Sequence, residues 1–455
     1  MKSKASPIKA EKVSSTKAEK ESEIIKIDPV TRLEGHGSIT IKLTKGKVSD
    51  VQFNVTSARF FEKFLEGRLA EDARIIAPRI CGICPEPHHL ASVKAVEAAW
   101  DINPPEPAKK LRELLLLAKQ ISSHALHLYV LAAPDFLLGP FAPPEVRNVV
   151  TVINKMPDAG KKAIELMKHG QELCAEIGGK SVHPVTAIPG GMTKGLTEGK
   201  RDEWLKRMDR AMELGEFTAG LLLKIVEDYW DVITKIGVFE TYYVGLTQNG
   251  EHNFYDGNIR VVSPLGKIES DTPTQKYMDV VGEQVVPHCY ATHVFYKPAG
   301  YPNGLWRGGP LARINVADRM ATPRGNEALK QFRDKVGRPC HATFAYHWAR
   351  VIELLDAIGK AKKLLEDPDI VSKDYKLETV EPREGVGAGV VEAPRGLLVH
   401  NYWTNKEGII TKANLIVATN NNVGAIEKSL KIIAKQVIED KVYETLKLPK
   451  PMIKI

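Results

Sequence analysis

Cysteine is scarce in this chain, which has five in 455 residues. So small and odd a number excludes a disulfide-stabilised scaffold and favours a reducing, cytoplasmic setting. Cys174, Cys289 and Cys340 each stand alone in the sequence. A single buried cysteine usually behaves as a small hydrophobic residue, so these three are expected in the core.

Long hydrophobic runs are also missing. The most apolar helix-like stretch, residues 125–138, is interrupted by Pro134 and Asp135 and is too short to span a bilayer, so membrane insertion is not expected. Residues 1–22 are rich in lysine, lack the apolar segment of a signal peptide and are expected to form a disordered tail. This tail carries part of the net charge of +8, and basic and aromatic residues do not interleave elsewhere, so nucleic-acid binding is not expected.

The remaining composition, 43% hydrophobic and 26% charged, is that of an ordinary globular protein. The length allows two to three domains, but no repeat and no Pro/Ser-rich linker divides the chain. A single domain over residues 23–455 is therefore predicted.

Helical periodicity dominates the pattern. In residues 108–132 a stripe of apolar side chains keeps helical spacing, and Leu116 and Leu117 add apolar surface beside it, which indicates burial among other helices. Further helices are predicted at 60–68, 88–100, 145–177 with a break at Pro157, 201–236, 327–366 with a break near Pro339, and 425–446. Strands are predicted at 38–55, turning at Lys45-Gly46, and in a hairpin of 396–403 with 408–419, while 24–37, 183–191 and 242–310 read as loops, the last two with short strands. The fold class is α+β, predominantly α-helical, with a core of long helices in a bundle and small antiparallel sheets.

The most informative run is Arg79-Ile80-Cys81-Gly82-Ile83-Cys84-Pro85-Glu86-Pro87-His88-His89. A Cys-x-x-Cys on a tight turn directs two sulfurs to one place, and thiolates favour Ni, Zn or iron–sulfur centres over Mg or Ca. Half of a zinc knuckle and a thioredoxin-like redox pair remain alternatives for a bare pair. Arg79, Gly82 and His88 make the run more specific than that.

With these flanking residues the run resembles the first cysteine motif of the large subunit of [NiFe] hydrogenases, Arg-x-Cys-Gly-x-Cys-x-x-x-His. The resemblance extends over residues 24–455 and is strongest to the methyl-viologen-reducing hydrogenases of methanogens. It implies that Cys81 is a terminal Ni ligand and that Cys84 bridges Ni and Fe, with carbon monoxide and cyanide on the iron.

The same resemblance assigns roles to other residues. Glu34, in a Leu-Glu-Gly-His run, would pass protons, and a site closed to water would raise the pKa of its carboxyl toward a working range. His88 would hydrogen-bond a bridging thiolate, while His89 has no matching role. Arg395, in Glu392-Ala393-Pro394-Arg395-Gly396, would donate hydrogen bonds to the cyanides, with Asp135 as its ionic partner.

A second ion, Mg or Fe, is implied near the end of the chain. Glu62 matches a glutamate that helps to hold it, although Phe60 stands where a glycine is usual, and the backbone carbonyl near Val423 is a weaker candidate for the same ion. The glycine-rich run 385–389 follows a charged loop rather than a strand, so it is not expected to bind a nucleotide.

Half of the expected ligand set is missing. The family supplies its second thiolate pair from Asp-Pro-Cys-x-x-Cys-x-x-His near the C-terminus, and this sequence has no such run. Three explanations are open: a short separate peptide that brings the pair, sometimes with selenocysteine; a truncation; or a degenerate relative without metal. Retention of Cys81, Cys84, His88, Glu34 and Arg395 argues against the last, and the divided subunit is favoured.

The predicted function is that of the catalytic large subunit of a cytoplasmic [NiFe] or [NiFeSe] hydrogenase that cleaves H2 heterolytically. Because the chain lacks cysteines for iron–sulfur clusters, an iron–sulfur small subunit is required to take the electrons. The resemblance implies onward transfer through an electron-transfer adaptor to a heterodisulfide reductase. The alternative function is a metal-free scaffold subunit of a redox complex, similar to a quinone-site subunit.

Overall fold

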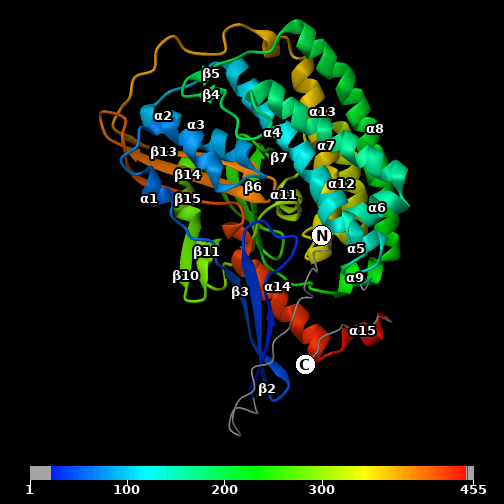
Figure 1. The fold of residues 1–455 in the computed structure, drawn as a ribbon. Helices are drawn as coiled ribbons and strands as arrows, with labels where there is room; N and C mark the ends of the chain where they lie inside the picture. Colours follow the sequence, from blue (N-terminus) through cyan, green and yellow to red (C-terminus); the bar gives the residue numbers. More distant parts are fainter. Residues whose placement is uncertain (1–21, 141, 447, 449–455) are drawn as a thin grey trace, which may run out of the picture.

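The computed structural model describes residues 22–140, 142–446 and 448, and helices dominate among them (Figure 1). The helices are α1 Phe61–Leu65, α2 Ala70–Ile76, α3 Pro85–Trp100, α4 Glu106–Leu126, α5 Ala133–Leu137, α6 Val149–Lys155, α7 Pro157–Gly178, α8 Glu198–Asp228, α9 Trp230–Lys235, α10 Tyr277–Val280, α11 Pro310–Val316, α12 Pro323–Val336, α13 Tyr346–Glu366, α14 Asn420–Ile438 and α15 Val442–Thr445. Of the predicted tail, only Ser22 falls within the described residues.

The strands form small, mostly antiparallel sheets. They are β1 Ser22–Ile27, β2 Gly37–Thr44, β3 Lys47–Val55, β4 Ala187–Ile188, β5 Gly191–Met192, β6 Tyr242–Gln248, β7 Glu251–His252, β8 Asn258–Val262, β9 Ile268–Pro273, β10 Val281–Val286, β11 Cys289–Tyr296, β12 Trp306–Arg307, β13 Gly385–Ala393, β14 Gly396–Thr404 and β15 Ile410–Ile416. The sheet orders are β1-β2-β3, β4-β5, β10-β11, β13-β14-β15, and β12-β6-β8-β9 with β7 beside β6. Only β12 with β6 is a parallel pair among these.

Local sequence explains where the helices break. The Asn148 side chain accepts a hydrogen bond from the N–H of Thr151 at 3.1 Å and so caps α6. Pro157 is the first residue of α7, where its missing N–H costs nothing. Thr322 caps α12 in the same way, through the N–H of Gly325 at 3.0 Å. The predicted breaks near Pro157 and Pro339 are confirmed.

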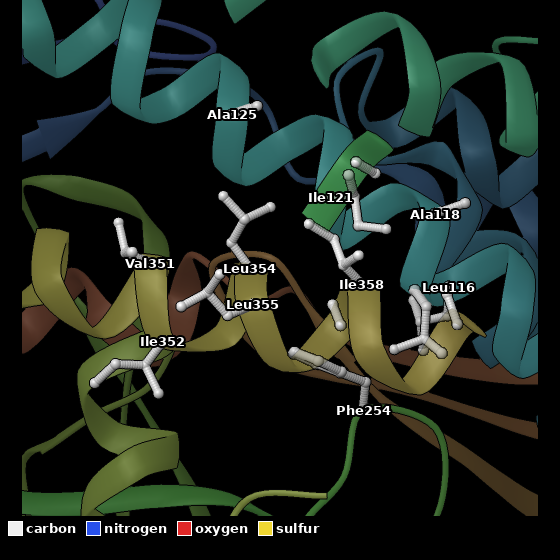
Figure 2. Packing of buried hydrophobic residues seen from close by; sticks show 14 of the residues in the cluster. Leu116, Ala118, Ile121, Ala125, Phe254, Val351, Ile352, Leu354, Leu355 and Ile358 are labelled. Carbon is white, nitrogen blue, oxygen red and sulfur yellow. The ribbon is translucent and has the colours of Figure 1, made fainter. Parts of the chain in front are cut away.

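The largest apolar core lies among the long helices α4, α7, α8 and α13, which pack against one another. Figure 2 shows Ile121 and Ala125 of α4 above Leu354 and Ile358 of α13. Leu114 to Leu117 are all fully buried, because helices contact α4 on several sides. The prediction of burial from apolar residues on more than one face is confirmed.

The stretch Glu106–Leu137 is, among the described residues, long and apolar enough to cross a membrane. However, 72% of its most apolar window is buried inside the protein. It therefore has the surroundings of a core helix. The predicted helix over residues 108–132 runs as regular α-helix to Leu126 and continues in wider, π-helical turns over His127–Ala132.

Two strands were not predicted. Residues 24–27, read as loop, belong to β1, which pairs with β2 from Ser22 opposite Thr44 to Ile27 opposite Ile39. The glycine-rich run 385–389 begins β13, which lies against α3. Gly385, Gly387 and Gly389 face that helix, and a Cβ on any of them would collide with its backbone. The glycines therefore serve close packing between strand and helix.

The long helix near the C-terminal end of the chain, α14, lies outside the main helical core. Helix α14 packs on β3 and β11, and the hairpin β2–β3 extends beyond it (Figure 1). Two carboxylates fix this contact. Glu427 of α14 accepts the N–H of Phe53 at 3.0 Å, and Glu439, just after the helix, accepts the N–H of Val48 at 2.8 Å.

Candidate metal centre

The two cysteines of the Cys-x-x-Cys run lie in a loop between a short 3-10 turn, Ala77–Ile80, and α3. Cys84 directly precedes Pro85, the first residue of α3, and its N–H donates to the Cys81 sulfur at 3.3 Å. The two Sγ atoms are 2.7 Å apart and both cysteines are free. The sulfurs therefore converge on one point, as the spacing predicted.

A hydrogen bond from the Cys84 thiol to the Cys81 sulfur shifts the pKa values of the two cysteines in opposite directions. The hydrogen bond from Cys84 lowers the pKa of Cys81 to about 7. The same hydrogen bond, followed by burial, raises the pKa of Cys84 well above its ordinary value, against the opposing charges of Arg395 and Lys119. One sulfur of the pair is thus available as a thiolate near neutral pH, and nearby cations favour ionisation of the other.

Arg395 lies in the tight turn that joins β13 to β14. Its guanidinium has no hydrogen bond or ion pair with any residue that the structure describes, although it is half-buried. The preceding residues are held by buried Arg313, which donates to Glu392 at 2.8 Å and to the carbonyl of Ala393 at 2.9 Å. A half-buried cation without an anionic partner among the described residues therefore lies close enough to Cys84 for its charge to act on that thiol.

Arg350 adds positive charge to the same region. Burial and the neighbouring charge of Arg395 lower the pKa of Arg350 to about 9. Its guanidinium donates to the carbonyl of Tyr346 at 3.3 Å, and no carboxylate forms an ion pair with it in the described part of the chain. Uncompensated cations at a partly buried site are costly, so an anionic group fits this place.

The position of Asp135 differs from the prediction. Its carboxylate pairs with Arg32 at 2.8 Å and lies 3.5 Å from Arg147, and no described ion pair joins it to Arg395. Arg32 also donates to the carbonyl of Leu131 at 2.7 Å. Because Arg32 belongs to the loop that carries Glu34, Asp135 anchors that loop on α5.

Glu34 is close enough to Cys81 for its charge to oppose ionisation of the thiol. Its side chain is exposed, so the expected exclusion of water from this carboxylate is not found among the residues that the structure describes. The physical reason is that Glu34 lies in a loop which no described element covers.

His88 is buried on α3, and its Nδ1 lies 3.0 Å from Nε2 of His400 on β14. The contacts continue from His400 to the Tyr402 hydroxyl at 2.9 Å and from there to Ser92 at 3.0 Å. Burial lowers the pKa of His88 to about 3, so the ring is neutral. No described hydrogen bond joins His88 to either sulfur, and its role toward the thiolate stays a prediction.

Glu62, on α1, accepts the N–H of Leu415 on β15 at 2.8 Å and pairs with Arg59 at 2.5 Å. The Val423 side chain is fully buried on α14 against Phe53. No described contact brings Glu62 and Val423 together. Arg59, the partner of Glu62, also donates to Thr292 at 3.3 Å, and Thr292 accepts from Asn420 at the start of α14 at 3.4 Å. The assignment of Glu62 and the carbonyl near Val423 to a second ion stays a prediction.

Sequence reasoning missed several residues of the site. Lys119 of α4 lies 3.2 Å from Glu86, with both side chains buried, and Arg350 and His400 were not singled out. Glu86 directly follows Cys84-Pro85, and a lysine within the apolar face of α4 was a signal of a buried pair. The alternation of β14 gives no comparable signal for His400.

Comparison with known proteins bears on the identity of this site. The family model "Nickel-dependent hydrogenase" matches residues 59–138, which include the cysteine pair, and the model "HoxL-like" matches residues 24–58. The F420-non-reducing hydrogenase vhu of Methanocaldococcus jannaschii has one subunit that is 51% identical over 416 residues, which are 91% of this chain and 99% of that protein.

Solved structures agree. A chain of an NAD+-reducing [NiFe]-hydrogenase in the H2-reduced state superposes with a TM-score of 0.87 at 33% identity, covering 91% of this chain and 93% of that one. The Ni-Fe-Se hydrogenase of D. vulgaris Hildenborough gives a TM-score of 0.76 at 26% identity over 90% of this chain and 94% of that one.

Each of these similar proteins is a hydrogenase, so the alternative of a metal-free scaffold has no support. The region that the nickel-dependent hydrogenase model matches includes the two cysteines whose sulfurs converge in this structure. The chain therefore belongs to the nickel-dependent hydrogenase family and is the large subunit of a hydrogenase.

Proposed function

We propose that Cys81 and Cys84 hold one half of a Ni–Fe centre and that a separate short polypeptide brings the other two sulfur or selenium ligands. The observation that carries this proposal is the convergence of two thiols at 2.7 Å in a loop beside unpaired cations. Two sulfurs leave such a centre open, and the remaining cysteines do not complete it. Cys174, Cys289 and Cys340 are buried at other places, on α7, on β11 and before α13.

The charges around the pair suit a centre whose iron carries carbon monoxide and cyanide. The Arg395 guanidinium offers only donors, which is the polarity that a cyanide nitrogen requires. Arg350 and Lys119 add positive charge near the thiolates and the cyanide ligands, which are anionic. We expect the Arg395 guanidinium to donate hydrogen bonds to the cyanide ligands when the centre is in place.

When bound, the Ni–Fe centre supplies heterolytic cleavage of H2, which yields two electrons and two protons. Glu34 is the residue of this chain placed to accept a proton from the side of Cys81. Asp135 holds the Glu34 loop through Arg32 at 2.8 Å. His88 and His400 form a neutral, buried pair that orients α3 against β14 directly behind the cysteine loop.

The electrons leave through an iron–sulfur small subunit, which is expected to cover the exposed Glu34 loop. An electron-transfer adaptor and a heterodisulfide reductase follow, in the cytoplasm. A Mg or Fe ion beside Glu62 is part of the same proposal. The carboxylate of Glu62 is already ordered by Arg59 and by the backbone of β15, as an ion ligand must be.

Elemental analysis of the native complex tests the centre, and mass spectrometry of the same sample tests the divided ligand set. We expect nickel and iron near one atom of each metal at the centre per chain, together with a co-purifying peptide of a few dozen residues that contains two cysteines or a selenocysteine and a cysteine. Absence of nickel from an intact, H2-oxidising complex would refute the centre. Nickel in a complex whose only other ligands come from this same polypeptide would refute the separate peptide.

A further inference from the structure

A second cluster of metal-ligating side chains lies away from the cysteine loop, where α14 packs on the β10–β11 hairpin. His288 is in the hairpin turn, His293 is on β11 and Glu427 is on α14. One ligand atom from each of the three lies within 4.8 Å of the other two. Figure 1 shows α14 and β11 next to each other, and the two elements pack against one another.

His293 gives the independent sign that something is bound here. Its side chain is buried with 1% exposure, and its Nε2 atom has no hydrogen-bond partner among the described residues. A buried polar atom without a partner is costly and calls for an explanation such as a missing ion. The other ring nitrogen, Nδ1, lies 3.3 Å from the Tyr301 hydroxyl.

That second contact is the one expected of a metal-bound histidine. Ligating histidines donate their free N–H to a polar neighbour, which fixes the ring and the tautomer. If Nδ1–H of His293 donates to Tyr301, Nε2 carries the lone pair and is free to act as the ligand. Gly424 leaves room for this ring, because a Cβ there would lie 3.3 Å from the Cγ of His293.

The other two ligands are already paired. Nε2 of His288 lies 2.7 Å from Oε2 of Glu427, and Glu427 is held in place by the Phe53 N–H at 3.0 Å. Both side chains are 20% exposed, and a cavity of about 610 Å³ lined by His293, Tyr301 and Glu427 adjoins them. An ion could enter from this cavity, and water could fill a fourth position.

We propose that His288, His293 and Glu427 form a binding site for a zinc-like divalent cation, with water as the fourth ligand. Two imidazoles and one carboxylate with an open position are a ligand set that Zn²⁺ accepts, and imidazole also suits Co²⁺ and Ni²⁺. The ion would replace the hydrogen bond between His288 and Glu427 and would tie the β10–β11 hairpin to α14. No described hydrogen bond or ion pair joins these three side chains to Cys81 or Cys84.

Cobalt titration of the full-length chain tests the proposal, because Co²⁺ reports its ligands by absorption. Thiolate ligation at Cys81 and Cys84 gives an intense sulfur-to-cobalt charge-transfer band, whereas the His288 site gives only ligand-field bands. In the C81S/C84S background we expect one equivalent of Co²⁺ to bind with ligand-field bands alone and to be displaced by Zn²⁺. Failure of that background to bind Co²⁺ would overturn the proposal.

Variants localise the site. In the same background, E427Q and, separately, H288N are each expected to weaken Co²⁺ binding at least about tenfold. The matched control is E439Q, because Glu439 makes the equivalent hydrogen bond to β3, through the N–H of Val48, without a histidine nearby. E439Q should keep full binding. Equal binding in E427Q, H288N and E439Q would overturn the assignment, and two independent ligand variants guard against one that fails to fold.

Discussion

Arg395 is the residue whose environment is hardest to explain without a bound anion. It is half-buried, it lies near Cys84, and its guanidinium has no partner among the described residues. Glu392, three residues earlier, is by contrast fully buried and paired with Arg313 at 2.8 Å. The chain thus holds the backbone of this turn firmly and leaves one cation for the centre.

The variant R395K keeps the positive charge and removes the planar, multi-donor head. We expect H2 oxidation with an artificial electron acceptor to fall about 100-fold, the usual loss when one oriented donor is removed, while nickel content stays near that of the wild type. R324K is the control, since Arg324 pairs with Glu216 on the surface of the helices. Unchanged activity in R395K would contradict the role given to Arg395.

His89 makes the stability of the chain depend on pH. Its Nε2 accepts the N–H of Ala187 at 3.0 Å and its Nδ1 lies 2.8 Å from the carbonyl of Arg74, so the ring is a buried, neutral tautomer. Burial lowers the pKa of His89 to about 3, whereas an unfolded histidine has a pKa near 6.5. The unfolded chain therefore binds the extra proton between these values, and stability is lost as the pH falls from about 6.5 toward 3.

Urea unfolding of the metal-free chain between pH 7 and pH 5 measures this loss. Below the unfolded pKa, His89 contributes up to about 1.4 kcal/mol of lost unfolding free energy per pH unit. H89Q should be less stable at pH 7, because its hydrogen bonds change, but should lose less stability on acidification. H36Q is the control, since His36 is exposed. Identical pH slopes for wild type and H89Q would refute the assignment.

At the scale of elements, the packing of β13 on α3 positions the site, because α3 begins beside Cys84 and β13 ends at the turn of Arg395. G387A places a methyl group against the backbone of α3. We expect a loss of about 3 kcal/mol or more in unfolding free energy and a parallel loss of nickel. V386A, on the exposed face of the same strand, should change stability by less than about 0.5 kcal/mol. Equal effects of the two substitutions in calorimetry would contradict this packing account.

The link between α5 and the Glu34 loop gives a second prediction at this scale. D135N removes the charge that holds Arg32, so the loop should become less ordered while the cysteine loop is untouched. H2 turnover should fall at least about threefold, because misplacing a proton acceptor slows transfer, and nickel content should not change. D158N, on the exposed first turn of α7, should leave turnover unchanged. A loss of nickel in D135N would instead place Asp135 at the metal centre itself.

At the scale of the whole molecule, the features that the sequence predicted are those set by residues close together in the chain. Prolines and apolar spacing located the long helices, and Lys45-Gly46 located the first hairpin. The strand β13 was missed because its glycines are explained only by close packing against α3, which lies almost 300 residues earlier in the chain. The partner of Asp135 was missed for the same reason, since Arg32 is 103 residues away.

The family motif located the converging thiols, and the fold then brought Arg395 to them. It could not show that Glu34 is exposed, because burial depends on which segments pack over its loop in the folded chain. Lys119 on the apolar face of α4 is a signal of a buried pair, but its partner Glu86 is identified only by the packing of α4 against the start of α3. The residues of a short motif were thus predictable from the sequence, whereas the partners of the charged side chains could be found only in the folded structure.

The central claim is that a metal centre is shared between this chain and another polypeptide. A nickel-edge anomalous difference map of the assembled complex tests it most directly. The account predicts one peak about 2.3 Å from a sulfur of the Cys81–Cys84 pair, with two further sulfur or selenium ligands that trace to a different polypeptide. A peak away from Cys81 and Cys84, or ligands that all trace to this chain, would contradict it.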